Sequence, residues 1–319
     1  MALPTYASPL ERLWHAAYLV ICTAIFIFLI APILVFIPLS FNAEPYFTFT
    51  QKMLSLDPDG YSTRWYETLL TFGMQNPEGN SGASWWQDAW NNAHWIKAAK
   101  NSLIIGFFAT VVATVLGTVA ALGLSRPEMP FRRAIMAMLI SPMIVPVIIS
   151  ALGMFFFYSN PCGILGMASP DGGAACGRLT GTYVGIVLAH ATLGIPFVII
   201  TVTATLVGFD QSLNRAAASL GANPRTTFFR ITLPLILPGV ISGALFAFVT
   251  SFDEVIVVLL IASPEQQTIP RQMWNGIREQ ISPAILAIAT LLVIFSIALL
   301  TTVELLRRRS EKIRGVTPR

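Results

Sequence analysis

The chain has 319 residues, of which 55% are hydrophobic and only 11% are charged, and its formal net charge is +4. Soluble domains carry about 25% charged residues, so the composition excludes a soluble domain and indicates an integral membrane protein. Three cysteines are too few for a disulfide scaffold. The basic residues cluster in alternate loops, which the positive-inside rule explains better than binding to nucleic acid does.

The N-terminal third combines one apolar run with a long polar stretch. Residues 1–16 are predicted to be a cytoplasmic tail, and residues 17–40 a first transmembrane helix that is too long for a cleavable signal peptide. Residues 41–100 are predicted to form a periplasmic loop rich in tryptophan: Trp65, Trp85, Trp86, Trp90 and Trp95. The stretch 85–95 is expected to be one amphipathic helix that anchors the chain at the headgroups, rather than an aromatic box for a ligand.

Five further apolar runs predict a five-helix core over residues 101–306. The runs are 101–124, 134–158, 183–207, 235–262 and 283–306. The first of them carries a stripe of small residues at every fourth position, which lets another helix approach closely: Ala109, Ala113, Gly117 and Ala121. The second contains Pro142 and Pro146 and is expected to be bent. His190, in the third, is expected to be hydrogen-bonded packing rather than a ligand.

The placement of charge gives the topology. Basic residues fall between 125 and 133, within 208–234 and in the tail 307–319, and the positive-inside rule assigns these segments to the cytoplasm. With six spans, both termini are cytoplasmic and the tryptophan-rich loop is periplasmic. The loop over residues 159–182 is also outside. Its two cysteines, Cys162 and Cys176, either form a disulfide that stabilises the fold by roughly 3 kcal/mol or are two free thiols.

The stretch 208–234 lies between two spans but is itself amphipathic. It predicts a helix over residues 211–220, a break at Gly221, a second short helix over 225–231 and a stop at Pro234. Two helices joined by a tight turn at a membrane face form a ledge on which another protein can dock. The alternative is a connector that lies on the headgroups with its arginines bound to anionic lipid.

This stretch resembles the EAA loop of ATP-binding-cassette (ABC) importer permeases. The residues that match are Ala216, Ala217, Gly221, Ala222, Phe229, Ile231, Leu233 and Pro234. The resemblance implies that the loop docks into a groove of a cytoplasmic ATPase subunit and couples its closure to movement of the membrane helices. Arg215 stands where the family has a glutamate, so this chain lacks the residue that would carry any salt bridge made by that glutamate.

One acidic pair, Asp253 and Glu254, lies inside a predicted span. A carboxylate near the bilayer centre costs roughly 2.5–3.5 kcal/mol, so it usually faces a bundle interior or a water-filled path. On a continuous helix Asp253 shares a stripe with Phe246 and Thr250, and Glu254 lies on another stripe. We expect Asp253 or Glu254 to line a pathway for a cationic solute; the alternative is a carboxylate satisfied by a neighbouring helix. Three nearby rings are available for cation–π contact: Phe246, Phe248 and Phe252.

The sequence holds no pattern for catalysis or for a cofactor. No lysine follows a glycine, so a Walker A loop for ATP is absent. The three histidines lie on separate segments without metal-ligand spacing, and no Gly-x-Ser-x-Gly elbow occurs. The chain is therefore expected to bind no metal or cofactor and to catalyse no reaction.

The region 101–309 resembles spermidine/putrescine-type permeases. The resemblance rests on the run 251–255, on Ile269 and Pro270, on Met273 and Trp274, and on the run 281–283. It implies a second permease subunit, commonly in a heterodimer, two ATPase subunits that hold ATP and magnesium, and a periplasmic substrate-binding protein. Polyamines are polycations, which fits an acidic pair in the membrane, although similar sequences serve other small amines, amino-acid derivatives, thiamine or ferric iron.

The sequence thus predicts an all-α protein of the bacterial inner membrane with six transmembrane helices and the type I ABC importer permease fold, its first helix wrapping the partner subunit. One alternative is a secondary transporter or channel, which would need coupling-ion sites that the spans lack outside the acidic pair. Another is a membrane-embedded enzyme, for which no nucleophile or metal set is present.

Overall fold

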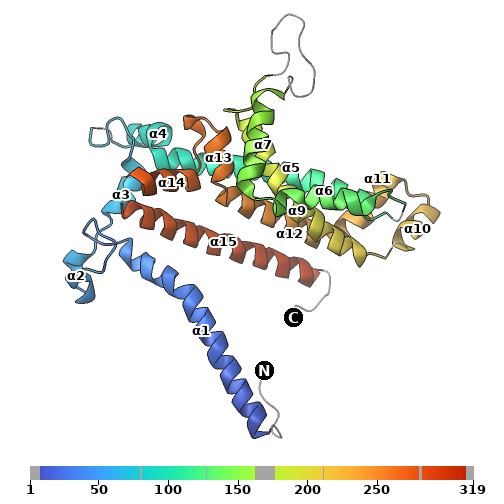
Figure 1. The fold of residues 1–319 in the computed structure, drawn as a ribbon, viewed down its shortest axis with the longest axis horizontal. Coiled ribbons are helices and arrows are strands. Elements are labelled where there is room, and N and C mark those ends of the chain that lie inside the picture. The colour runs from blue at the N-terminus through green and yellow to red at the C-terminus, as the bar shows by residue number, and fades with distance from the viewer. Residues whose placement is uncertain are drawn as a thin grey trace, which may run out of the picture. The chain divides into compact units, whose positions relative to one another are not determined.

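The computed structural model describes residues 8–79, 81–126, 128–161, 177–210, 212–279 and 282–313. Within these ranges the secondary structure is helical apart from one isolated bridge between Asn42 and Tyr61. The chain divides into two compact units, one formed by Met1–Phe72 and Gly276–Arg319 and the other by Gly73–Asn275 (Figure 1).

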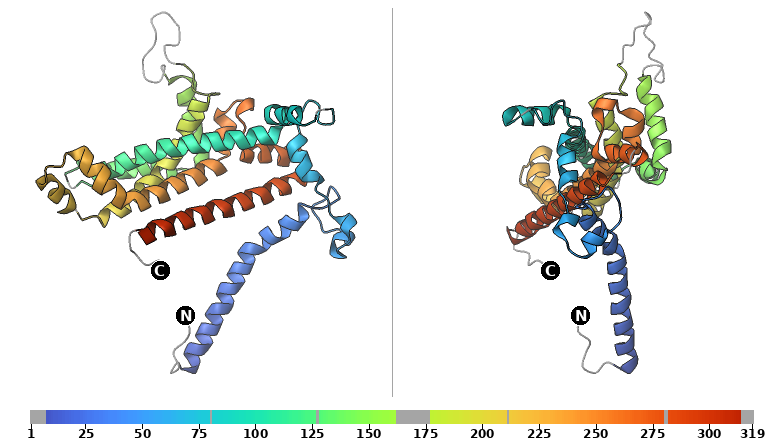
Figure 2. Two further views of the ribbon diagram at one scale, coloured as in Figure 1. Left: turned by 180° about the vertical axis from the view of Figure 1, so that it is seen from behind. Right: turned by 90° about the vertical axis from the view of Figure 1, so that its left-hand side faces the viewer.

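The first unit is built on two long helices, α1 (Pro9–Leu39) and α15 (Ala284–Ile313). They contact each other, and α15 also contacts α3 (Arg64–Thr71) (Figure 2). A capping box starts α1, because the Ser8 N–H donates to Glu11 Oε2 at 2.8 Å and the Glu11 N–H donates to Ser8 Oγ at 3.3 Å. This box satisfies two free donors of the first turn, so the helix begins well before the apolar run that predicted it.

The segment between α1 and α3 has a defined fold. It contains α2 (Gln51–Leu54) and a 3₁₀ turn, η1 (Pro58–Gly60). The side-chain amide of the fully buried Asn42 donates from Nδ2 to the backbone carbonyls of Tyr46, at 2.9 Å, and Thr48, at 3.0 Å. The backbone carbonyl of Asn42 accepts from Trp65 Nε1 at 2.8 Å. A buried amide that is satisfied in this way fixes the backbone around it.

The prediction of one helix over residues 85–95 is wrong. Helix α4 (Ala83–Asn92) ends before Ala93, whose extended backbone (ψ 122°) separates it from α5 (His94–Leu124). Trp86 and Trp90 of α4 are 62% and 57% exposed, whereas Trp95 is buried in α5. The second long helix therefore starts before residue 101, and Trp95 belongs to the packed core.

Three helices pack together as the core of the second unit: α5, α9 (Tyr183–Val207) and α12 (Leu233–Asp253) (Figure 1). The small-residue stripe of α5 is buried, which confirms that another helix approaches it, and the helices that do so belong to the same chain. Gly194 of α9 lies where the three meet. A Cβ at Gly194 would lie 3.0 Å from Ala247 Cβ and 3.3 Å from Ala113 Cβ, so a larger residue would push the helices apart.

The third predicted span is bent, as its prolines predicted. It consists of α6 (Arg132–Ile144) and α7 (Val147–Ser159), which meet at an angle of 103°. Pro146 stands at the N-cap of α7, where a residue without an N–H interrupts the helical hydrogen bonds. Cys162 and Cys176 lie outside the described residues, so their pairing stays a prediction.

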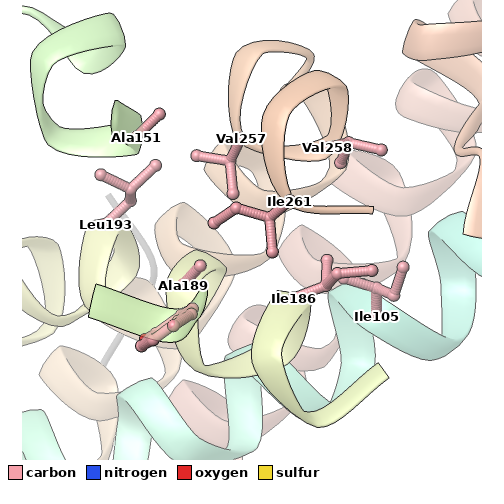
Figure 3. Close-up of a cluster of buried hydrophobic side chains, with 9 residues drawn as sticks. Ile105, Ala151, Ile186, Ala189, Leu193, Val257, Val258 and Ile261 are labelled. Atoms are coloured by element: carbon pink, nitrogen blue, oxygen red, sulfur yellow. The ribbon is translucent and has the colours of Figure 1, made fainter. Parts of the chain in front are cut away.

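After α12 the chain forms short elements. They are α13 (Ile256–Ile261), the 3₁₀ turn η3 (Pro264–Gln266) and α14 (Ile269–Glu279). Figure 3 shows Val257, Val258 and Ile261 of α13 gathered with side chains of α7 and α9 in a buried cluster. The prediction of one continuous helix over 235–262 is therefore wrong.

Within the described ranges, five helices are long and apolar enough to cross a membrane, and the bent pair α6 and α7 makes a sixth span if it is counted as one. The five are α1, α5, α9, the stretch Pro224–Asp253 and the apolar part of α15. The all-α fold is confirmed, and the predicted count of six spans fits when the bent pair is counted as one.

Candidate functional site

The loop between α9 and α12 contains the two predicted helices. They are α10 (Ser212–Ser219) and α11 (Pro224–Thr227). Gly221 between them has a φ of +81°, and a Cβ there would meet nothing within 4 Å. The position therefore requires glycine for its left-handed backbone and not for space. Asn223 caps α11, since its Oδ1 accepts from the Thr226 N–H at 2.8 Å.

The predicted stop at Pro234 is wrong. From α11 the chain runs through a π-helical turn, η2 (Phe228–Thr232), directly into α12. Pro234 is the second residue of α12, directly after the π-helical turn, so this proline does not end the helical stretch. The second short helix is therefore joined rigidly to a membrane span.

The exposed side of the loop is partly apolar. Leu220 is 89% exposed at its tip and Phe229 is 64% exposed, whereas Ala217 is only 5% exposed and packs inward. Arg215 and Ala216 are also exposed. Among the other residues of the resemblance, Pro234 is exposed and three are half-buried: Ala222, Ile231 and Leu233.

Charge on the loop is mainly positive, from Arg215, Arg225 and Arg230. Asp210 is used locally, because Ser212 donates to it from Oγ at 2.7 Å and from its N–H at 2.8 Å. These two bonds hold the pKa of Asp210 below its usual value. A partner for this surface therefore meets a cationic ledge that also carries the exposed apolar side chains of Leu220 and Phe229.

A cavity of about 360 Å³ lies behind the loop. Leu206 and Phe209 line it from the end of α9, and Asn214 and Phe228 line it from the loop. The loop is thus not packed flush against the ends of α5 and α9.

The second candidate region is the break between α12 and α13. Asp253 is the last residue of α12 and Glu254 its C-cap, so neither lies within a continuous helix. Glu254 Oε1 accepts from the N–H groups of Ile256, at 2.7 Å, and Val257, at 3.1 Å. The Asp253 side chain is exposed and receives no hydrogen bond from the described residues. The two acids therefore have different roles, because Glu254 caps α13 while Asp253 remains available.

Arg271 of α14 holds the other end of α13. Its Nη1 donates to the carbonyls of Val258, at 2.9 Å, and Ala262, at 3.3 Å. The last carbonyls of a helix lack internal donors, and a cation there also opposes the helix dipole favourably. Charged side chains of opposite sign thus cap the two ends of a six-residue helix.

The aromatic residues near the break stack on one another. Phe248 and Phe252 stack with ring centroids 5.6 Å apart, and Phe246 stacks on Phe197 at 6.1 Å. Phe246 is 52% exposed, so part of this side chain is accessible from outside the chain. Thr250, on the predicted stripe with Asp253, is half-buried.

His190 is hydrogen-bonded packing, as predicted. It is 1% exposed, and its Nδ1 lies 2.8 Å from Ser251 Oγ. Sequence reasoning missed this partner, because the two residues are far apart in the chain. It also missed Leu220 and Arg271; a large apolar residue directly before a break glycine was the available signal for Leu220.

Comparisons with known proteins agree with this architecture. Residues 113–312 match the family described as "Binding-protein-dependent transport system inner membrane component". The chain is 29% identical to the "Spermidine/putrescine transport system permease protein PotC" of Haemophilus influenzae, over 90% of this chain and 94% of that protein. It is 31% identical to the "Putrescine transport system permease protein PotI" of Escherichia coli K12, over 91% of this chain and 88% of that protein.

A solved structure shares the fold. It is a bacterial ABC transporter involved in the import of the acidic polysaccharide alginate, with a TM-score of 0.64 over 94% of this chain and 99% of that chain. The sequence identity is only 16%, so this likeness concerns the fold and not the solute.

Proposed function

The chain belongs to the family of binding-protein-dependent transport system inner membrane components, and from this membership we propose that it is the membrane-spanning subunit of an ATP-driven importer for a polyamine such as putrescine or spermidine. The observation that carries the choice of a cationic solute is the exposed carboxylate of Asp253 at the break after α12. Asp253 is the last residue of the span Pro224–Asp253, and an ionisable residue of a membrane span is by default a candidate functional residue, often one that faces a solute path. The names of the two permease relatives support the same solute class.

The partners follow from the loop. The surface that docks on a separate ATPase subunit is formed by exposed residues of the loop: Leu220, Phe229, Arg215 and Ala216. Two such subunits bind ATP and magnesium, a second permease subunit completes a heterodimer, and a periplasmic protein delivers the solute. Both termini lie in the cytoplasm. Movement of the ATPases is transmitted through α11 and η2 into α12, which ends at Asp253.

The solute path is tested by replacing each acid with its amide. Asp253→Asn removes the charge, and we expect uptake of labelled putrescine by cells with this chain as their sole copy to fall roughly tenfold, since a charge-assisted contact contributes about 1.5–3 kcal/mol. ATP hydrolysis by the purified complex should stay within about twofold. Glu254→Gln is the matched control, because its amide oxygen can accept the same two N–H bonds, and it should change uptake little. Unchanged uptake in Asp253→Asn would remove the pathway role.

The ATP-driven class is tested by purification of the tagged chain in mild detergent. We expect an ATPase with a Walker motif to accompany it. A chain that purifies alone and transports after reconstitution would instead be a secondary transporter or channel. If the periplasmic partner binds thiamine, ferric iron, an amino-acid derivative or another amine instead, the assignment of a polyamine as the solute is wrong.

A further inference from the structure

A regular antiparallel seam joins α9 to α12. A Cβ at Gly243 of α12 would lie 2.8 Å from Val198 Cα, and one at Gly194 of α9 would lie 3.0 Å from Ala247 Cβ. One turn further along both helices, His190 Nδ1 lies 2.8 Å from Ser251 Oγ. At the first two positions, Val198 with Gly243 and Gly194 with Ala247, the helices approach closely without a side-chain hydrogen bond. At the third position, His190 and Ser251 form a buried hydrogen bond, and this is the last of the three positions before α12 ends.

This bond fixes the rotation of the last turn of α12. Successive residues of an α-helix are about 100° apart, so Asp253 lies about 200° around the helix from Ser251. With Ser251 only 5% exposed against α9, Asp253 points to the opposite side, where it is exposed. The chain leaves the helix directly after Asp253, where Glu254 has an extended backbone (ψ 124°), so no further turn of α12 holds this end in place.

We propose that His190 is a positioning residue of the solute path. Through its bond to Ser251 it holds the end of α12 in the rotation that presents Asp253 to the solute. The inference rests on the pathway role proposed above for Asp253. It assigns a task to a buried polar side chain whose Nε2 has no hydrogen-bond partner among the described residues, a cost that packing by an aliphatic residue would avoid.

The two ring nitrogens provide a matched pair of variants. An asparagine at 190 places its amide near the position of Nδ1 and can keep the bond to Ser251. A glutamine reaches the position of Nε2, where the structure offers no partner. Ser251→Ala removes the same bond from the other side with almost no change of volume, so it tests the proposal even if a variant at 190 fails to fold.

The experiment measures labelled putrescine uptake in cells and ATP hydrolysis by the purified complex, for His190→Asn, His190→Gln, Ser251→Ala and Asp253→Asn. We expect His190→Gln and Ser251→Ala to lower uptake roughly three- to tenfold while hydrolysis and recovered complex stay near wild type. His190→Asn should retain most uptake. In an Asp253→Asn background, Ser251→Ala should lower uptake little further, because there is no charge left to position.

Several results would overturn the proposal. One is equal uptake by His190→Asn and His190→Gln in complexes recovered in normal amounts. Another is wild-type uptake by Ser251→Ala, and a third is a full additive loss when it is combined with Asp253→Asn. If Asp253→Asn alone transports normally, the pathway role fails and the positioning role fails with it. If the His190 and Ser251 variants transport normally but Asp253→Asn does not, the pathway role of Asp253 holds and the positioning role of His190 is wrong.

Discussion

The loop between α9 and α12 and the break between α12 and α13 hold their shapes by different means. The loop relies on the left-handed backbone of Gly221 and on one uncharged side-chain cap, Asn223, and it leaves Leu220 and Phe229 exposed. The break and the short helix α13 that follows it rely on charged side chains, Glu254 at one end of α13 and Arg271 at the other, whose groups are used within the chain. Variants of exposed loop residues should therefore affect partner binding without affecting stability, whereas variants at the break should affect stability as well.

The largest effect is expected at Gly221, where backbone shape and partner binding coincide. Gly221→Val places a β-branched residue at a φ of +81°, which costs about 1–2 kcal/mol or more and misdirects the docking tip. We expect putrescine uptake and recovery of the ATPase to fall by more than about tenfold. Gly221→Asn is the control, because asparagine tolerates this backbone region. Equal losses in both variants would show that φ is not the reason for glycine.

A smaller effect is expected at the tip of the loop. Leu220→Ala removes apolar surface that is 89% exposed in this chain, and we expect the affinity for the ATPase to fall about fivefold, measured by titration of the purified subunits. The Tm of the isolated chain should not change. Leu220→Met should restore most of the affinity. A fall in Tm would show instead that Leu220 stabilises the chain itself.

The smallest effect is expected at Glu254. Glu254→Ala removes the acceptor for the N–H groups of Ile256 and Val257, which should lower stability by about 1 kcal/mol. Thermal unfolding in detergent should show a Tm a few degrees lower, and Glu254→Gln should remain near wild type. If the glutamine variant is as unstable as the alanine variant, the charge and not the acceptor is what α13 requires.

The sequence was sufficient for the parts of the fold that depend on local patterns. Residues 183–207 match α9 because an uninterrupted apolar run is bounded by polar residues, and Pro142 and Pro146 marked the bend between α6 and α7. Gly221 was likewise recognisable as a break, because a glycine between two amphipathic stretches is a local signal for a turn. These signals are local and survive without knowledge of neighbouring helices.

The sequence was insufficient where distant residues decide the structure. The residues 253–255 contain no proline or glycine, so nothing local announced the end of α12. The far end of α13 is held by Arg271 of α14, and the last turn of α12 is held by His190, which is 61 residues away from Ser251 in sequence. For the same reason the different uses of Asp253 and Glu254 were hidden, and both acids looked equally available.

The caps at both ends of α13 have a consequence for charge balance at the break. The charges of Glu254 and Arg271 are committed to backbone groups, so of these three charged residues Asp253 is the one that is exposed and receives no hydrogen bond from the described residues. Under the proposed function, a diamine that reaches the break meets one negative charge from this subunit. Its second ammonium group must then be matched by the other membrane subunit or keep its water, so solutes of different valence are distinguished by the assembled pair of subunits.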